Sequence, residues 1–410
     1  MVSTITITIK RDRYYKEGQK QGPKYNTKGR RTLLTREGCQ ARQERLRQRL
    51  SDSSLDAIVL VHPAEIYYFT GVLLPESFPG QPGLLWIEAA GGSWLAAHSD
   101  DGEPLVDACY TYDSDLGGTI NSYLRTQLGE LVVERLQARG ARAAHVGYQR
   151  EFMPRMLAEH VDKGLGGAAT WVDVDEQLHQ MQEVKDDDEI ALIRKAVQVD
   201  LAAYDAAQKA IAPGVLELDV LGSAQHAAHL AAGEKVFHDG DYQSGEDGGF
   251  ARNRPIEEGE LYIIDAWATY RGYWADLCRT FSVGEPTDLQ ESIFNHLRAF
   301  HDRVGDYLQP GKDSRECART MDAYIREHPA LAEVGLGHHG GHTIGLRAHQ
   351  MPDVNATRGG IFEVGNVVSI EPGSYIPEAR AGVRLENMYL ITESGPENLS
   401  VYPMEIRPQR

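Results

Sequence analysis

The segment ELYIIDAWATYRGYWADLCRTFSV at residues 260–283 is predicted to form a β-hairpin with Thr269-Tyr270-Arg271-Gly272 at its tip. Asp265 ends an apolar run, which is typical of a strand that leaves a protein core. Asp265 and Asp276 lie symmetrically about the tip, and residues directly opposite on antiparallel strands have Cβ atoms roughly 4.5–5.5 Å apart. In simple register, the hairpin therefore places two carboxylates side by side on one face.

A second hairpin is predicted over residues 364–392, with Pro377-Glu378-Ala379-Arg380 at its tip. Glu371 and Glu386 lie symmetrically about this tip, and Glu371 also ends an apolar run. Four carboxylates brought together in this way repel one another, and burial strengthens the repulsion. Two divalent cations would balance the four negative charges. The two hairpins therefore predict a two-metal site rather than solvated strand ends.

Between the hairpins lies the segment GHHGGHTIGLRAH at residues 337–349, in which four glycines are interleaved with four histidines. Glycines allow the backbone to approach whatever the imidazoles hold. An imidazole beside oxygen ligands favours Mn, Co, Fe or Zn over Mg or Ca. The chain contains neither a GxxxxGK[ST] phosphate loop nor an HExxH zinc helix.

The second half of the chain repeats the order helix, helix, hairpin. Asp186-Asp187-Asp188 is expected to cap a long helix that ends at Pro213-Gly214, and a second helix is predicted over residues 217–232. The order recurs with helices over residues 289–308 and 313–328 before the second hairpin. We interpret this recurrence as an internal duplication.

The first half of the chain predicts a smaller α/β domain. After a helix over residues 35–50, strands are expected at residues 57–61, 66–69, 83–88 and 93–97. A helix over residues 121–139 then leads to a strand at residues 144–148. This alternation indicates an α/β domain that ends near residue 175. We therefore predict a basic arm over residues 1–34, an α/β domain over residues 35–175 and a metal-holding domain over residues 183–408.

Charge and cysteine usage restrict the classes of partner and compartment. The chain carries 42 Lys and Arg against 60 Asp and Glu, a net charge of −18, although nine of the basic residues lie within residues 1–34. A strongly acidic body disfavours nucleic acids and anionic membranes as partners. No apolar run approaches the roughly 18 residues that span a bilayer. Four cysteines without CxxC spacing, and a start without a secretory pattern, are typical of a cytoplasmic protein.

These motifs resemble the peptidase family of Xaa-Pro aminopeptidases, prolidases and creatinase, over roughly residues 36–405. Asp265 and Asp276 keep that family's spacing of ten intervening residues, and His342 matches the His of its Gly-His-x-x-Gly motif. Glu371 fits its Glu-Pro-Gly motif, and Glu386 fits Gly-Val-Arg-Leu-Glu. The resemblance implies that these five residues are the metal ligands.

The resemblance implies an α+β architecture: a catalytic domain with the pita-bread fold, preceded by a smaller α/β domain of the creatinase type. It implies two divalent metal ions, with Mn or Co favoured over Zn or Fe, and a homodimer. The implied reaction is hydrolysis of the amide bond before proline in a peptide, by a hydroxide that bridges the two metals.

The resemblance also suggests roles for residues around the metals. Glu371 would carry a proton from the nucleophile to the leaving nitrogen, and His349 would stabilise the oxyanion. His338 would line the pocket of the leaving group. Arg384 would hold a substrate carboxylate or, equally well, act as a structural partner of the acidic cluster.

One departure from the family pattern leaves alternatives open. Peptidases of the family usually carry another His about 17 residues before the first Asp, but that position lies near Gly248 and no His occurs between residues 239 and 264. His238 lies too far upstream, and His339 stands where the family more often has Gly. The alternatives are a metal-dependent hydrolase of a small non-peptide amide and a non-catalytic binding module. Such modules typically lose metal ligands, whereas this chain retains all five.

Overall fold

The computed structural model describes residues 34–74, 81–98, 103–112, 115–116, 119–120, 123–140, 145–167 and 169–409. The predicted basic arm lies outside the described residues apart from Leu34, as do the first residues of the predicted 121–139 helix and 144–148 strand. None of the helices in the described ranges combines the length and apolar character that a membrane span requires.

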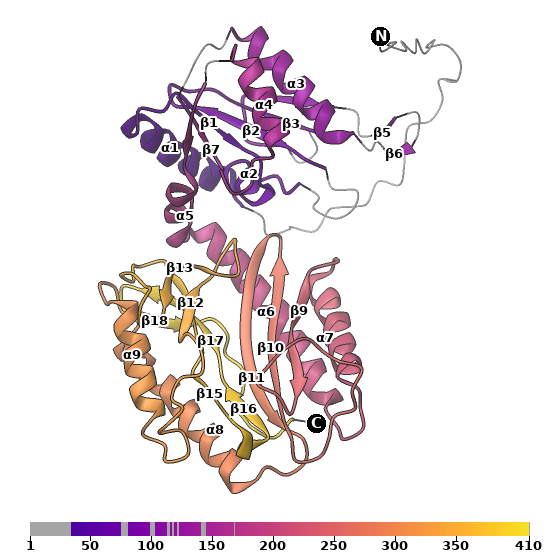
Figure 1. Cartoon of the computed structure of the whole chain (residues 1–410), viewed down its shortest axis with the longest axis vertical. Helices are drawn as coiled ribbons and strands as arrows, with labels where there is room; N and C mark the ends of the chain where they lie inside the picture. The colour runs from indigo at the N-terminus through magenta and orange to yellow at the C-terminus, as the bar shows by residue number, and fades with distance from the viewer. Residues whose placement is uncertain are drawn as a thin grey trace, which may run out of the picture. The chain divides into compact units, whose positions relative to one another are not determined.

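A six-stranded sheet of order β4-β3-β2-β1-β7-β8 forms the centre of the first half of the described chain (Figure 1). The strands are β1 (Ala57–Leu60), β2 (Leu84–Glu88), β3 (Ser93–Ala97), β4 (Ala108–Thr111), β7 (His145–Tyr148) and β8 (Thr170–Asp173), and a separate pair is formed by β5 (Asp115–Leu116) and β6 (Thr119–Ile120). The helices are α1 (Arg36–Asp52), α2 (Pro63–Thr70), α3 (Leu124–Ala138), α4 (Arg155–Gly164) and α5 (Asp175–Glu183). β1 pairs antiparallel with β2 and parallel with β7. The α/β organisation agrees with the prediction.

The prediction of a strand at residues 66–69 is wrong, because these residues lie in helix α2. Pro63 occupies the first turn of the helix, where its fixed φ and missing N–H are tolerated. Gly71 ends the helix in the left-handed conformation, with φ 74°. All four residues are buried, and a short apolar run that is buried on every side has no periodicity that separates a strand from a helix.

The second half repeats a helix pair and a hairpin, as predicted. The first set comprises α6 (Asp187–Ala210), α7 (Glu217–Ala232) and a three-stranded sheet of β9 (His238–Ser244), β10 (Leu261–Tyr270) and β11 (Tyr273–Ser282). The second set comprises α8 (Asp288–Phe300), a 3-10 helix (His301–Asp306), α9 (Ser314–Ile325) and a five-stranded sheet of β12 (Gly341–Thr343), β13 (Gln350–Val354), β14 (Val367–Ile370), β17 (Asn387–Thr392) and β18 (Gly395–Asn398). The strands β15 (Gly373–Ile376) and β16 (Ala381–Arg384) pair separately, with the short 3-10 helix Pro377–Ala379 between them. The predicted cap of α6 is confirmed as a capping box between Asp186 and Glu189.

The register of the first hairpin corrects the prediction that its two aspartates face each other. Asp265 lies opposite Cys278 rather than Asp276. The tip is a two-residue turn, in which Arg271 has φ 51° and Gly272 has φ 83°. Positive φ at both central residues is the pattern of a type I′ turn. The centre of the hairpin therefore lies between Arg271 and Gly272, further along the chain than predicted. The two aspartates are therefore diagonal neighbours on one face, at a typical separation of about 7–8 Å between Cα atoms.

The second hairpin keeps the predicted symmetry. Ile370 pairs with Asn387, and Gly373 pairs with Arg384, so one register runs through both ladders. Glu371 and Glu386 lie opposite each other in this register, at the break between the β14–β17 and β15–β16 ladders. The break frees both glutamates from regular strand pairing while the flanking ladders hold them in place.

Helix α2 is tied to the second half of the chain through the fully buried Glu65. Its carboxylate accepts hydrogen bonds from the amides of Gln149 and Gln182, both at 3.0 Å. It also forms ion pairs with Arg347 and with His62, whose Nδ1 lies at 2.9 Å. Burial acts to raise the pKa of Glu65, but the bonds from His62 and Arg347 outweigh it and lower the pKa to about 2.

Glu65→Gln is expected to destabilise the metal-free protein at pH 7 by on the order of 3 kcal/mol. Because the folded pKa of Glu65 lies below its ordinary value, its contribution is complete above about pH 4.5 and is lost as the pH falls toward about 2. The difference between the two proteins should therefore shrink over that interval, as measured by urea unfolding at several pH values. Glu44→Gln, on the exposed face of α1, is the control and should change little. An unchanged difference down to pH 2.5 would contradict the assignment.

Candidate metal centre

The five residues predicted as metal ligands come from separate segments of the second half of the chain. Asp265 lies in β10, Asp276 in β11 and His342 in β12. Glu371 directly follows β14, and Glu386 directly precedes β17. None of the five is more than 7% exposed. Strand pairing thus brings them into a place that is nearly closed to solvent.

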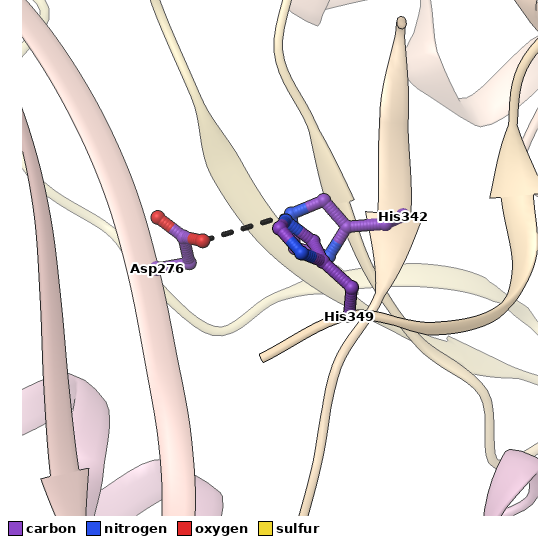
Figure 2. Close-up of side chains that lie close together, drawn as sticks. All are labelled: Asp276, His342 and His349. Atoms are coloured by element: carbon purple, nitrogen blue, oxygen red, sulfur yellow. Dashed lines mark ion pairs between the residues drawn. The ribbon is translucent and has the colours of Figure 1, made fainter. Parts of the chain in front are cut away.

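The ligand atoms of these side chains form two overlapping groups, and within each group they lie within 4.8 Å of one another. One group contains Asp265, Asp276 and Glu386, and the other contains His342, Glu371 and Glu386. Asp276 points from β11 toward His342, with its Oδ2 3.6 Å from Nε2 (Figure 2). Glu386 belongs to both groups, so the arrangement suits two adjacent cations that share one carboxylate.

Several oxygens of these carboxylates lack the hydrogen-bond partners that buried polar atoms need. Burial raises the pKa of Asp265 to about 6, even against the nearby charge of Arg384. Burial and neighbouring carboxylates raise the pKa values of Asp276 and Glu386 well above their usual range. Among the described residues, Asp265 Oδ1, Asp276 Oδ1 and Glu386 Oε1 are buried without a hydrogen-bond partner. Buried oxygens are normally satisfied, so this donor set fits divalent cations.

His342 presents a nitrogen in the form that a metal requires. Its Nδ1 donates to the carbonyl oxygen of Thr343 at 3.2 Å, which leaves Nε2 unprotonated. Burial lowers the pKa of His342 to about 3, so the ring is neutral at physiological pH. Nε2 lies 3.9 Å from Glu371 Oε1. The imidazole therefore turns its lone pair toward the carboxylates of the centre.

Two histidines flank Glu371, one of which was not predicted to belong to the site. His339 Nδ1 lies 3.1 Å from Glu371 Oε1, and His338 Nδ1 lies 3.6 Å from Oε2. Burial acts to raise the pKa of Glu371, but the hydrogen bond from His339 and the nearby imidazoles lower it to about 2. His338 also packs against Tyr375, with ring centroids 5.7 Å apart. Sequence reasoning noted His339 only as a departure, although its place among the interleaved glycines was a usable signal.

Arg384 is committed to acidic neighbours. Its Nη2 lies 3.0 Å from Asp265 Oδ2 and 2.5 Å from Asp241 Oδ2, and its Nη1 donates to the Tyr375 hydroxyl at 3.2 Å. Asp241 lies opposite Asp265 where β9 pairs with β10. The sequence left open whether Arg384 binds a substrate carboxylate or supports the acidic cluster. These contacts favour the role of a structural partner of the cluster. Sequence reasoning missed Asp241, because only the pairing of β9 brings it to the site.

His349 lies beside the imidazole of the centre. Its ring is perpendicular to that of His342, with centroids 4.0 Å apart (Figure 2). One ligand atom each from His349, His342 and Asp276 lies within 4.8 Å of the others. Unlike His342, His349 is exposed. It is therefore placed to meet a molecule that enters from solvent.

The position near Gly248, where the family usually has an imidazole, is filled by other groups. Gly248 has φ 139°, and an added Cβ would lie 2.4 Å from Asp241 Oδ2 and 3.2 Å from Arg384 Nη2. His238 does not compensate, because it is buried in the core beside Tyr242, with Nε2 3.0 Å from the hydroxyl oxygen. The Asp241–Arg384 pair thus occupies the space next to this position.

Both halves of the chain match models of known protein families. Residues 191–393 match the model of metallopeptidase family M24, and residues 42–184 match that of the creatinase/prolidase N-terminal domain. The chain is 32% identical over 241 residues to a Xaa-Pro dipeptidase of Pyrococcus horikoshii, covering 57% of this chain and 67% of the relative. It is 26% identical over 373 residues to a Xaa-Pro dipeptidase of Pyrococcus furiosus, covering 89% of this chain and 99% of the relative.

Solved structures show the same architecture. The prolidase from Pyrococcus horikoshii superposes with a TM-score of 0.71 at 24% identity, over 89% of this chain and 99% of that one. The prolidase from Pyrococcus furiosus superposes with a TM-score of 0.69 at 23% identity, over 87% and 99% of the two chains. Fold and site define a pita-bread metallopeptidase with a creatinase-type N-terminal domain, as the sequence predicts. The chain belongs to metallopeptidase family M24, which implies divalent metal ions and a peptide substrate.

Proposed function

We propose that this chain is a dinuclear Xaa-Pro peptidase that cleaves the amide bond before proline. The proposed metal ligands are Asp265, Asp276, His342, Glu371 and Glu386. The main support is the buried pair of overlapping ligand groups, in which Asp276 and Glu386 have raised pKa values and unsatisfied oxygens. Relatives that cover most of the chain are named Xaa-Pro dipeptidases, which supports proline at the second position.

The donor set of one imidazole and four carboxylates suits Mn or Co, and also Zn or Fe. Bound divalent ions supply Lewis acidity, which makes water a stronger nucleophile and polarises the scissile carbonyl. The homodimer and the cytoplasmic location that the sequence suggests stay predictions, as does the absence of nucleic acid and membrane partners.

Glu371 is the proposed proton carrier. Burial acts to raise its pKa, but the hydrogen bond from His339 and the nearby imidazoles lower the pKa to about 2. The carboxylate is therefore ionised at neutral pH. An ionised carboxylate accepts a proton from the attacking water and can return it to the leaving nitrogen. The main-chain N–H of Glu371 donates to the Gly340 carbonyl oxygen at 3.0 Å, which holds the residue at the strand break. Glu371 is thus both ordered and charged, as this role requires.

Three further residues have proposed roles around the scissile bond. His349 would donate a hydrogen bond to the oxygen that becomes negative in the tetrahedral stage. His338, next to Tyr375, would line the pocket of the leaving proline. Arg384 would orient Asp265 through its ion pair, since its guanidinium is already held by two carboxylates. These residues orient the substrate and support the ligand set.

The direct test is turnover of Ala-Pro by protein loaded with Mn or Co, with Ala-Ala as the matched control peptide. We expect Ala-Pro to be cleaved much faster than Ala-Ala, and cleavage to fall at least about 10³-fold after chelation and to return with metal. Tripeptides of the form Ala-Pro-Xaa then distinguish an aminopeptidase from a dipeptidase. Failure to cleave any proline peptide in the loaded state, together with cleavage of an N-acyl amide, would instead support the small-amide alternative.

A further inference from the structure

A buried tyrosine hydroxyl is bonded to both strands of the β10–β11 hairpin. Tyr204 belongs to α6, which packs on this hairpin (Figure 1), and its side chain is fully buried. The hydroxyl accepts a hydrogen bond from the main-chain N–H of Ala266 at 3.2 Å. It also lies within hydrogen-bond distance of two main-chain carbonyl oxygens, that of Ile264 at 2.8 Å and that of Leu277. Since a hydroxyl has one proton, these two carbonyls share it.

The bonded groups lie directly between the two proposed aspartate ligands. Ala266 follows Asp265 along β10. Its partner in the ladder, Leu277, follows Asp276 along β11. The carbonyl of Ile264 belongs to the peptide bond before Asp265, so the hydroxyl contacts the peptide groups on both sides of this ligand. One side-chain oxygen is thus bonded to the main chain next to each aspartate.

A regular ladder would have direct hydrogen bonds at this position. Hydrogen-bonded and non-hydrogen-bonded pairs alternate along an antiparallel ladder, and the two-residue turn is flanked by the hydrogen-bonded pair Tyr270–Tyr273. Counting from there, Ala266–Leu277 is again a hydrogen-bonded pair. Here the Tyr204 hydroxyl joins the N–H of one member to the carbonyl of the other. The spacing of the strands at this pair therefore depends on a group that α6 supplies.

Of the two overlapping ligand groups, one depends on this hairpin. Asp265 and Asp276 both lie in the hairpin and form one group with Glu386. The members of the other group, His342, Glu371 and Glu386, lie outside β10 and β11. A change in the spacing of the two strands therefore acts on one cation more than on the other.

We propose that Tyr204 is a positioning residue for one of the two cations, because its hydroxyl fixes the spacing of Asp265 and Asp276. The inference rests on the proposed metal ligands. Tyr204 shares a core with Ile264 and Ala266. These two side chains alternate with that of Asp265 along β10, so Tyr204 acts from the face of the sheet opposite the carboxylates. It supports the centre without contacting a cation or the substrate.

The test is a calorimetric titration of the metal-free full-length protein with Mn(II). In Tyr204→Phe, one ion should bind at least about tenfold more weakly, because loss of an outer partner of a metal ligand costs about 10–100-fold in affinity. The other ion should keep its affinity within about threefold. Tyr68→Phe is the matched control, since Tyr68 is also fully buried and its hydroxyl donates to the Met181 carbonyl oxygen at 2.8 Å. This control should leave both affinities unchanged.

Replacement of Tyr204 by p-aminophenylalanine tests the hydrogen bonds apart from the ring. The amine both donates and accepts, so this protein should fold and bind both ions within about threefold of the unsubstituted affinities, even if Tyr204→Phe does not fold. Normal binding of both ions by Tyr204→Phe, equal weakening of both, or the same loss in Tyr68→Phe would overturn the inference. A p-aminophenylalanine protein with one weakened ion would also overturn it.

Peptide cleavage is measured separately on the same proteins. If Tyr204→Phe binds both ions normally while the unsubstituted protein cleaves Ala-Pro, the inference alone fails. If the unsubstituted protein binds two ions but cleaves no proline peptide, the peptidase function fails and the titrations still decide the role of Tyr204. If it binds no ion, the proposed centre and this inference fail together.

Discussion

Glu386→Gln is expected to lower kcat/KM for Ala-Pro by at least about 10³-fold and to reduce the bound metal from two ions per chain to one or none. Glu386 belongs to both ligand groups, so the substitution weakens both sites at once. Loss of an outer partner of a metal ligand already costs about 10–100-fold, and loss of a shared ligand should cost more. Turnover assays and elemental analysis after dialysis measure the two effects. Normal metal content and activity in this variant would remove the basis of the dinuclear site.

The same substitution should stabilise the metal-free protein at neutral and higher pH. Burial and nearby carboxylates raise the pKa of Glu386 far above its usual range, so the folded chain binds this proton more strongly than the unfolded chain. The free energy of unfolding therefore falls as the pH rises and Glu386 loses its proton. An uncharged amide at this position avoids that loss of stability. Glu378→Gln is the matched control, because Glu378 is exposed at the tip of the same hairpin. A purely structural role for Glu386 would give destabilisation instead.

Glu371→Gln is expected to lower kcat by about 10³-fold or more while KM changes little. The amide keeps an oxygen at the centre but cannot carry a proton between water and the leaving nitrogen. His339→Ala provides the comparison, because it removes a neighbour of Glu371 and leaves the carboxylate in place. We expect a loss of about tenfold or less for this variant.

Steady-state kinetics and metal content together separate the two roles of Glu371. If Glu371→Gln retains its metal but loses kcat, Glu371 acts as a proton carrier. If the variant loses both metal and kcat, Glu371 acts only as a metal ligand. A Glu371→Gln enzyme that keeps more than a tenth of its activity contradicts the proposed role. Equal losses in Glu371→Gln and His339→Ala would show that orientation of Glu371, rather than its proton, limits the rate.

Sequence reasoning proposed five ligand positions, and most of them have a local signature. Asp265 and Glu371 both end apolar runs, and His342 lies among interleaved glycines. The symmetry of Glu371 and Glu386 about their hairpin tip is confirmed by the register of both flanking ladders. Patterns of this kind span a few adjacent residues, so they can be recognised without knowledge of the packing.

The errors arose where a local pattern has two solutions. Residues 66–69 form a fully buried run, which a helix and a strand accommodate equally well, and the proline and glycine around it decided for the helix. The tip of the first hairpin is a two-residue turn at Arg271 and Gly272 rather than the four-residue tip expected. The shorter turn changes which residue pairs with Asp265, but Asp265 stays on the same face of the hairpin.

The sequence by itself determined the family, the order of the elements, the α+β architecture and the acidic and imidazole residues of the proposed centre. Only the tertiary structure decided which groups surround these residues. Asp241 reaches Arg384 because β9 pairs with β10, and Glu65 of α2 reaches Arg347 because α2 packs against the segment before His349. The physical reason is that chain-local patterns record which face a residue occupies, whereas contacts between distant segments depend on strand register and packing, which no local pattern encodes.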